Sequence, residues 1–173
     1  MSLTDNPSAD ADSAYRELLA QMRAGLVGVT DPAIVGIFSG GAWVAERLAT
    51  DLGLAHRLGF IDVSFYRDDY AKKGLHPDVK PTHIPFNVDG ATIILVDDVL
   101  YTGRTTRAAI NVLFDYGRPA RIMLAALADR GGRELPVAAE FTGVRVALQP
   151  GQSLALAKGP DSQLSLTVEE DNV

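Results

Sequence analysis

The sequence contains no cysteine, which excludes disulfide bonds and thiolate metal sites. It also contains no apolar run close to the roughly 20 residues that cross a bilayer, so no membrane-spanning helix is expected. The first residues, MSLTDNPSADADS, are acidic and polar, the opposite of a signal or transit peptide. These absences predict a cytoplasmic protein with no membrane contact.

Positive charge is also scarce. The 173 residues include 16 Lys and Arg against 22 Asp and Glu, which gives a net charge of −6. This balance provides no overall attraction to nucleic acids, although a local basic patch is compatible with it. The phosphate loop G-x-x-x-x-G-K-[ST] is absent, and the turn at Ser39 fails the hydrolase pattern G-x-S-x-G at Ile37. The histidines His56, His76 and His83 have no motif spacing, so we interpret them as incidental.

The apolar residues that are present change their period along the chain. A helical stripe over residues 15–26, with Asp12 or Ser13 as its N-cap, precedes a buried strand over 33–38 and a helix over 42–52. Further strands are predicted over 60–66, 83–86, 92–98 and 122–128, with β-prone pieces at 143–148 and 164–168. A helix is predicted over about 105–116, with a buried face formed by Ala109, Val112, Leu113 and Tyr116. This order predicts an α/β fold with a mostly parallel sheet flanked by helices. We expect a flexible tail over residues 1–13 and one domain over 14–173.

The stretch TIILVDDVLYTGRTTRAA carries the clearest chemical signal. Asp97 and Asp98 end a predicted strand, and ligands of parallel sheets bind at that end. The threonine-rich run 102–106 then opens a helix, whose N-terminal N–H groups and dipole favour an anion, while Gly103 permits close backbone approach. The acids can accept hydrogen bonds from sugar hydroxyls or hold Mg²⁺. The combination predicts a sugar-phosphate site.

Other interpretations of this stretch remain open. The threonines could serve only as helix caps, and the two acids could form a solvated strand end. A phospho-acceptor receiver domain also places paired acids at a strand end, but typically near its N-terminus and without these threonines.

The same residues resemble the phosphoribosyl-pyrophosphate (PRPP) signature of the type I phosphoribosyltransferases. In addition, SFYRDD, VDDVLYTGRT, DYGRP and DRGGRELP follow one another in the order and spacing of the PyrR family. Members of that family are pyrimidine-operon attenuation regulators that also have uracil phosphoribosyltransferase activity. The resemblance covers roughly residues 33–146 and implies the type I fold, with a mobile loop over the active site at the aperiodic residues 67–81.

The resemblance also implies a role for each part of the site. Asp97 and Asp98 are the expected catalytic residues, facing the ribose and holding a metal only indirectly, through ribose or water. For both to contribute, the strand must depart from regular alternation. The other expected residues are Tyr101, Thr102, Gly103, Arg104, Thr105 and Thr106 for the 5′-phosphate, Ser39, Gly40, Gly41 and Arg67 for pyrophosphate, and Asp129, Arg130 and Gly131 for the base. Lys72 and Lys73 are further candidates for pyrophosphate.

The implied partners are PRPP, uracil, UMP and pyrophosphate, with Mg²⁺ as cofactor and a homodimer or homotetramer as assembly. Two alternatives are a UMP-sensing regulator that binds pyrimidine-operon leader RNA and a transferase for a purine base. RNA binding is expected to be weak, with Arg16, Arg23, Arg133 and Arg145 as its candidate contacts. Two positions depart from the family pattern: Gly40 replaces the arginine of a threonine-arginine-glycine turn, and Gly132 replaces a histidine.

Overall fold

A computed structural model of the chain describes residues 7–64 and 81–171. The predicted mobile loop over 67–81 therefore lies outside the described residues, except for its last residue. Arg67, Lys72, Lys73 and His76 lie outside them as well. The helices are α1 (Pro7–Gly25), α2 (Gly40–Leu52), the short 3-10 helix η1 (Ala55–Arg57) and α4 (Arg104–Tyr116). The strands are β1 (Ala33–Ile37), β2 (Leu58–Ile61), β3 (Thr92–Leu100), β4 (Arg121–Asp129), β5 (Phe141–Arg145), β6 (Gln152–Lys158) and β7 (Leu164–Glu170).

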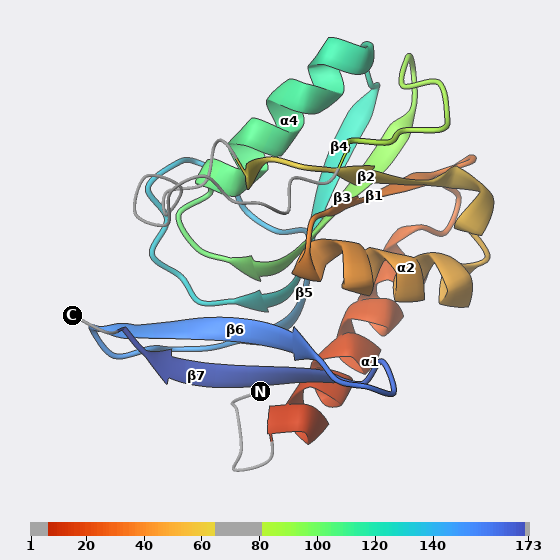
Figure 1. The fold of residues 1–173 in the computed structure, drawn as a ribbon. Helices are drawn as coiled ribbons and strands as arrows, with labels where there is room; N and C mark the ends of the chain where they lie inside the picture. Colours follow the sequence, from red (N-terminus) through yellow and green to blue (C-terminus); the bar gives the residue numbers. More distant parts are fainter. Residues whose placement is uncertain (1–6, 65–80, 172–173) are drawn as a thin grey trace.

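A five-stranded sheet in the order β2-β1-β3-β4-β5 forms the centre of the molecule, and every neighbouring pair in it is parallel (Figure 1). The middle strand β3 is buried over Ile93–Val96, because both of its faces are covered. The predicted α/β class with a mostly parallel sheet is therefore confirmed. All five strands also end at the same edge of the sheet, which is where the site forms.

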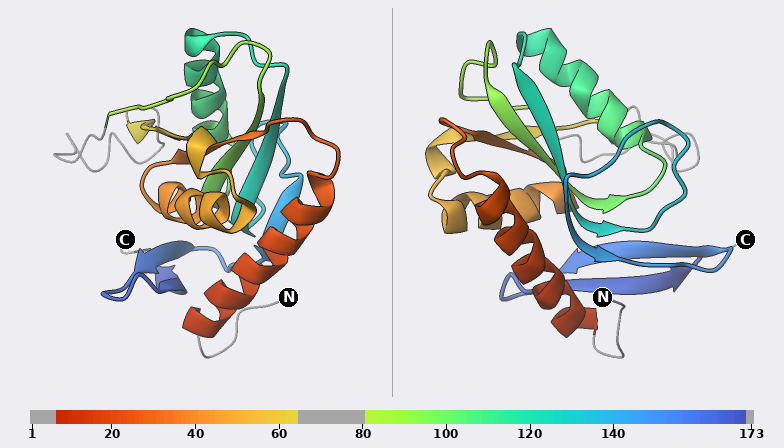
Figure 2. Two further views of the ribbon diagram at one scale, coloured as in Figure 1. Left: turned by 90° about the vertical axis from the view of Figure 1, so that its right-hand side faces the viewer. Right: turned by 180° about the vertical axis from the view of Figure 1, so that it is seen from behind.

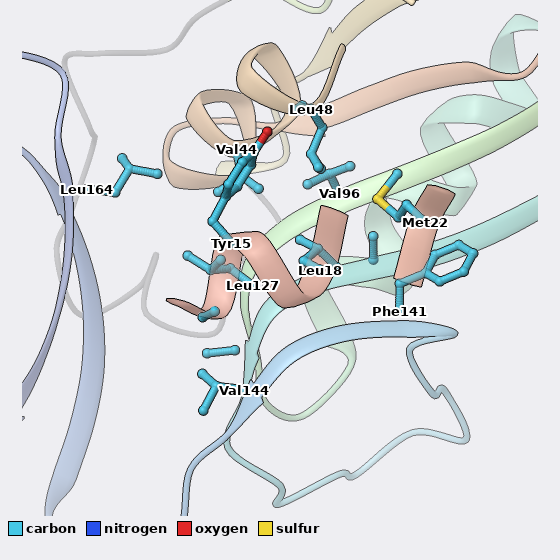
Figure 3. Close-up of a cluster of buried hydrophobic side chains, with 14 of the residues drawn as sticks. Tyr15, Leu18, Met22, Val44, Leu48, Val96, Leu127, Phe141, Val144 and Leu164 are labelled. Carbon is cyan, nitrogen blue, oxygen red and sulfur yellow. The ribbon is translucent and has the colours of Figure 1, made fainter. Parts of the chain in front are cut away.

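Helices cover the two faces of this sheet (Figure 2). On one face, α1 and α2 pack on β1, β3 and β4, and Figure 3 shows Tyr15, Leu18 and Met22 of α1 within that cluster. On the other face, Ala109 and Leu113 of α4 pack on the sheet as predicted. Val112 is partly buried and packs against the same cluster, whereas Tyr116 is 50% exposed, so the predicted burial of Tyr116 is wrong. The helical stripe turns away from the sheet by the last turn of α4.

The strands β6 and β7 form a separate antiparallel hairpin beside the carboxyl ends of β3 and β4 (Figure 1). Leu154, Leu164 and Leu166 of the hairpin join the cluster formed with α1 and α2. The pattern at 164–168 indicated β7, but β6 was missed, because QSLALAK is rich in residues with low strand propensity. Pairing with β7 and packing against the domain make it a strand.

Several predicted boundaries are wrong. Helix α1 begins at Pro7 rather than after Asp12 or Ser13, so part of the predicted tail is helical, and Ala11 is fully buried. Strand β2 ends at Ile61, and the expected strand at 83–86 is reduced to one bridge between His83 and Phe60. These short segments depend on tertiary pairing more than on local pattern.

Among the described residues, no strand pairs with the outer edge of β5, and a side chain covers part of that edge. The Gln21 carboxamide accepts from the N–H of Thr142 and donates to its carbonyl, both at 3.0 Å. This double contact replaces the strand that would otherwise pair there. Among the described residues, no helix has the length and apolar character needed to span a membrane.

Candidate active site

Two carboxylates lie near the carboxyl end of β3. Asp97 is 3% exposed and Asp98 is partly exposed. Val96 and Val99 both belong to the side covered by α1 and α2, although strict alternation would place residues three apart on opposite faces. The strand therefore departs from regular alternation across the two acids, as their joint use requires. The Asp98 N–H donates to Asp97 Oδ1 (2.9 Å), and the Val99 N–H donates to Asp98 Oδ1 (2.8 Å). Each carboxylate is therefore held against the backbone N–H of the next residue.

The turn after β1 brings a helix N-terminus against these acids. Helix α2 begins at Gly40, and a Cβ added there would lie 2.2 Å from Asp98 Oδ2. A Cβ on Gly41 would lie 2.5 Å from the carbonyl oxygen of Val96. Gly41 thus permits the close approach of α2 to the backbone of β3, and Gly40 leaves room for the Asp98 carboxylate. Among the described residues the N–H groups of Gly40 and Gly41 have no acceptor, so they point to an anion site.

The turn after β3 forms a second helix N-terminus. Gly103 has a φ of 94°, in the left-handed region, and α4 begins at Arg104. The Arg104 N–H donates to the Thr102 hydroxyl at 3.2 Å. The N–H groups of Thr105 and Thr106 have no acceptor in the part of the chain that the structure describes, and the buried Thr106 hydroxyl has no partner there either. These donors and the helix dipole suit a phosphate group.

The turn after β4 is built around Asp129, which pairs in register with Leu100 of β3. Its Oδ1 accepts from the Gly131 N–H at 2.9 Å, and its Oδ2 accepts from Arg133 at 2.6 Å and Arg145 at 3.3 Å. Burial by itself favours the neutral form, but the hydrogen bonds from Arg133 and Gly131 and the Arg145 charge outweigh it and hold the pKa of Asp129 below its ordinary value. Asp129 therefore shapes this turn with both of its oxygens.

Arg130 and Tyr101 stack beside this turn. The Arg130 guanidinium lies 3.8 Å from the centre of the Tyr101 ring and donates to the Gln152 carbonyl at the start of β6. Gly132 has a φ of 80°, and a Cβ added there would lie 2.5 Å from the Tyr101 ring. The half-exposed Tyr101 thus occupies the space that a histidine at position 132 would need.

The structure brings the described residues of the predicted site to one edge of the sheet, because β1, β3 and β4 are parallel and end together. Sequence reasoning overlooked the part that Arg133 plays here, since it had been considered only as an RNA contact. The spacing of four between Asp129 and Arg133 was the available signal. Glu134 was overlooked as well, and its carboxylate forms an ion pair with Arg104 at 2.9 Å.

Comparison with known proteins agrees with this geometry. Residues 5–149 match the model of the family described as "Phosphoribosyl transferase domain". The chain is 52% identical to "Bifunctional protein PyrR" of Ralstonia nicotianae, over 92% of this chain and 94% of that protein. The protein of the same name from Nitrosococcus oceani is 45% identical over 93% of each chain.

Solved structures show the same similarity of fold. The crystal structure of a purine phosphoribosyltransferase from Pyrococcus horikoshii superposes with a TM-score of 0.60 at 27% identity, over 85% of this chain and 90% of that one. A hypoxanthine phosphoribosyltransferase of Trypanosoma cruzi has a TM-score of 0.60 at 19% identity, over 82% and 79% of the two chains, and shows similarity of fold alone.

The lowered pKa of Asp129 leads to a testable pH dependence. A carboxylate with a depressed folded-state pKa stabilises the fold above its ordinary pKa, and this stabilisation disappears as the pH falls below about 4. Asp129→Asn should lower the free energy of unfolding at pH 7 by about 2 kcal/mol and weaken its dependence on pH below about 4. Urea unfolding at several pH values measures both effects. Glu140→Gln, which breaks an exposed ion pair with Arg121, is the control and should leave both unchanged. An Asp129→Asn curve that follows the wild type at every pH would contradict this assignment.

Proposed function

The chain belongs to the PyrR family of phosphoribosyltransferases, and on this basis we propose that it transfers the 5-phosphoribosyl group of PRPP to uracil, giving UMP and pyrophosphate. The proposal includes a cytoplasmic location and a homodimer or homotetramer, both of which the family resemblance implies.

One observation carries the proposal: the Asp97–Asp98 pair is flanked by two helix N-termini whose first N–H groups have no acceptor among the described residues. PRPP has two anionic groups separated by a ribose. Its 5′-phosphate fits the N-terminus of α4, where the N–H groups of Thr105 and Thr106 and the Thr106 hydroxyl are available. Its pyrophosphate fits the N-terminus of α2, and the ribose then lies over the two acids.

The residues present also fit Mg²⁺. No group of three or more His, Cys, Asp or Glu side chains that could hold a metal ion exists among the described residues. Mg²⁺ is commonly held by one or two carboxylates, water and substrate phosphates, so Asp97 and Asp98 beside a pyrophosphate site suit it. When bound with PRPP, the metal would neutralise part of the charge on the pyrophosphate. Asp97 and Asp98 would hold it through ribose or water.

The chain itself contributes positioning and electrostatics to the proposed reaction. The bond from C1 of the ribose to pyrophosphate breaks as a bond to a ring nitrogen of uracil forms, and the proton of that nitrogen is released to solvent. Positive charge develops at C1, and the carboxylates of Asp97 and Asp98 stabilise it. The N–H groups of Gly40 and Gly41 receive the departing pyrophosphate, while the turn over Asp129–Gly131 holds the base in line. An arginine at position 40 would require Asp98 to take another conformation, since a Cβ there would lie 2.2 Å from its carboxylate oxygen.

A nucleobase panel tests the proposed reaction. The protein is incubated with PRPP, Mg²⁺ and uracil, cytosine, hypoxanthine, guanine or adenine, and pyrophosphate release is followed. We expect release with uracil far above that with every other base. A clear preference for hypoxanthine or guanine would instead identify a purine transferase.

The acidic pair provides a direct mutational test. Asp97→Asn and Asp98→Asn keep the size of the side chain and remove its charge, so kcat should fall by about 10²-fold because charge stabilisation at C1 is lost. Melting temperatures should change little in the Asp98 variant, whose side chain is partly exposed. Steady-state kinetics and thermal denaturation separate the two effects. Near-normal rates in both variants would remove these residues from catalysis.

A matched pair of glycine substitutions tests the proposed 5′-phosphate site over residues 101–106. Gly103 and Gly53 both have a left-handed φ, 94° and 70°. A Cβ on Gly103 would lie 2.4 Å from the Val137 side chain, whereas Gly53, at the end of α2, has open space around it. Both alanine variants should lose about 1 kcal/mol of stability from backbone strain. Only Gly103→Ala should also weaken UMP binding, by about tenfold or more, since it alone displaces the phosphate donors.

Calorimetric titration with UMP measures this difference. Uracil alone carries no phosphate, so its binding provides an internal comparison. Equal UMP affinity in the Gly103 and Gly53 variants would move the 5′-phosphate away from this turn.

The family resemblance implies RNA-dependent regulation as a second activity, and the name of the relatives describes them as bifunctional. Each of the four arginines considered from sequence contacts another group of the protein. Arg16 pairs with Asp12, Arg133 and Arg145 contact Asp129, and Arg23 donates to the carbonyl of Asp51. RNA affinity depends mainly on such charges meeting phosphates.

We therefore expect weak binding to a pyrimidine-operon leader RNA. At about 0.15 M salt, a filter-binding assay should show little retention and only a slight change on adding UMP. The control is an unrelated hairpin of equal length. Tight, UMP-enhanced binding to the leader hairpin alone would make regulation the primary function.

A further inference from the structure

The segment after β4 lies directly against the turn after β3. The Thr102 carbonyl accepts from the N–H groups of Glu134 and Leu135, at 2.9 and 3.1 Å. We call residues 101–106 the phosphate turn and residues 129–135 the base turn. Two backbone hydrogen bonds therefore join the phosphate turn to the base turn.

Arg133 adds side-chain contacts to this junction. Its guanidinium donates to Asp129 Oδ2 at 2.6 Å, to the Tyr101 carbonyl at 2.9 Å and to the Val137 carbonyl at 3.0 Å. The side chain is 24% exposed, and all three nitrogens of the guanidinium are used in these contacts. A single residue thus binds the carboxylate at the end of β4, the start of the phosphate turn and the chain beyond the base turn.

We propose that Arg133 is a positioning residue that fixes the distance and angle between the phosphate turn and the base turn, so that ribose C1 and the attacking nitrogen of the base meet in line. This inference rests on the proposed transferase function, since the two turns hold the two reactants only if that function is correct. Arg133 itself touches neither reactant and acts through Tyr101 and Asp129.

The planar guanidinium is essential to this role. Its nitrogens are held in one rigid fork, which allows three acceptors in different directions to be bound at once. A lysine has a single charged nitrogen on a flexible chain, so it can neutralise Asp129 without bridging to both carbonyls. Loss of the bridge would allow small shifts between the turns, and a misplacement of about 1 Å can cost about 10²-fold in rate.

The chain provides a matched control in Arg145. It contacts the same oxygen, Asp129 Oδ2, at 3.3 Å, but its side chain is 75% exposed and forms no bridge to the phosphate turn. Removing Arg145 therefore removes a charge near Asp129 and leaves the junction between the turns intact.

The kinetic test compares Arg133→Gln, Arg133→Lys and Arg145→Gln with the wild type, using PRPP, uracil and Mg²⁺. We expect kcat to fall between about 10- and 100-fold in both Arg133 variants, because alignment is a property of the transition state. The KM for uracil should change much less than kcat. Arg145→Gln should retain wild-type kinetics. Full recovery of kcat in Arg133→Lys would overturn the proposal, because charge beside Asp129 would then suffice.

Hydrogen exchange tests the junction independently of activity. The amides of Glu134 and Leu135 should exchange faster in Arg133→Gln than in the wild type, while amides in the middle of β3 keep their protection. Arg145→Gln should show wild-type exchange at all of these positions. Unchanged exchange at Glu134 and Leu135 in Arg133→Gln would overturn the proposed bridge.

The two arms distinguish failure of this inference from failure of the proposed function. A wild-type protein that releases no pyrophosphate with uracil would overturn the proposed function, whereas the exchange arm would still decide whether Arg133 holds the turns together. An active wild type with normal kcat in both Arg133 variants would overturn the positioning role alone.

Discussion

The parallel pairing of β3 between β1 and β4 is the constraint on which the site depends. Parallel strands end at the same edge, so three turns that are far apart in the sequence meet there. The pairing is stable because the residues of β3 before the acids are buried on both faces, by α1 and α2 on one side and α4 on the other. Asp97 and Asp98 follow this buried part of β3 directly. Hydrophobic packing thus determines where the chemistry is placed.

Glycine determines how closely the parts of this edge approach. A Cβ at Gly40 or Gly41 would collide with Asp98 or with the backbone of β3, and one at Gly103 would collide with Val137. The two positions that depart from the family pattern, Gly40 and Gly132, have the same physical explanation. Gly40 leaves room for the Asp98 carboxylate, and Gly132 leaves room for the Tyr101 ring. In each case a neighbouring side chain fills the space that a larger residue would take.

Several ion pairs lie at the turns that form the site. The Asp129 carboxylate accepts hydrogen bonds from Arg133, Arg145 and the Gly131 N–H. Glu134 forms an ion pair with Arg104 in the phosphate turn. These contacts define loops that have no regular secondary structure. The arginines involved therefore help to shape the site.

The sequence by itself determined the α/β class, the strand–acid–threonine stretch and the family, because apolar period and local motif are properties of neighbouring residues. It also indicated that the strand must depart from alternation at Asp97 and Asp98. It did not locate the start of α1 at Pro7, the strand β6 or the exposure of Tyr116, since burial and pairing with distant residues decide these features. The role of Arg133 likewise depends on three acceptors, of which the Tyr101 carbonyl is 32 residues away. Only the tertiary structure, in which β3 and β4 lie side by side, brings that carbonyl and the guanidinium together.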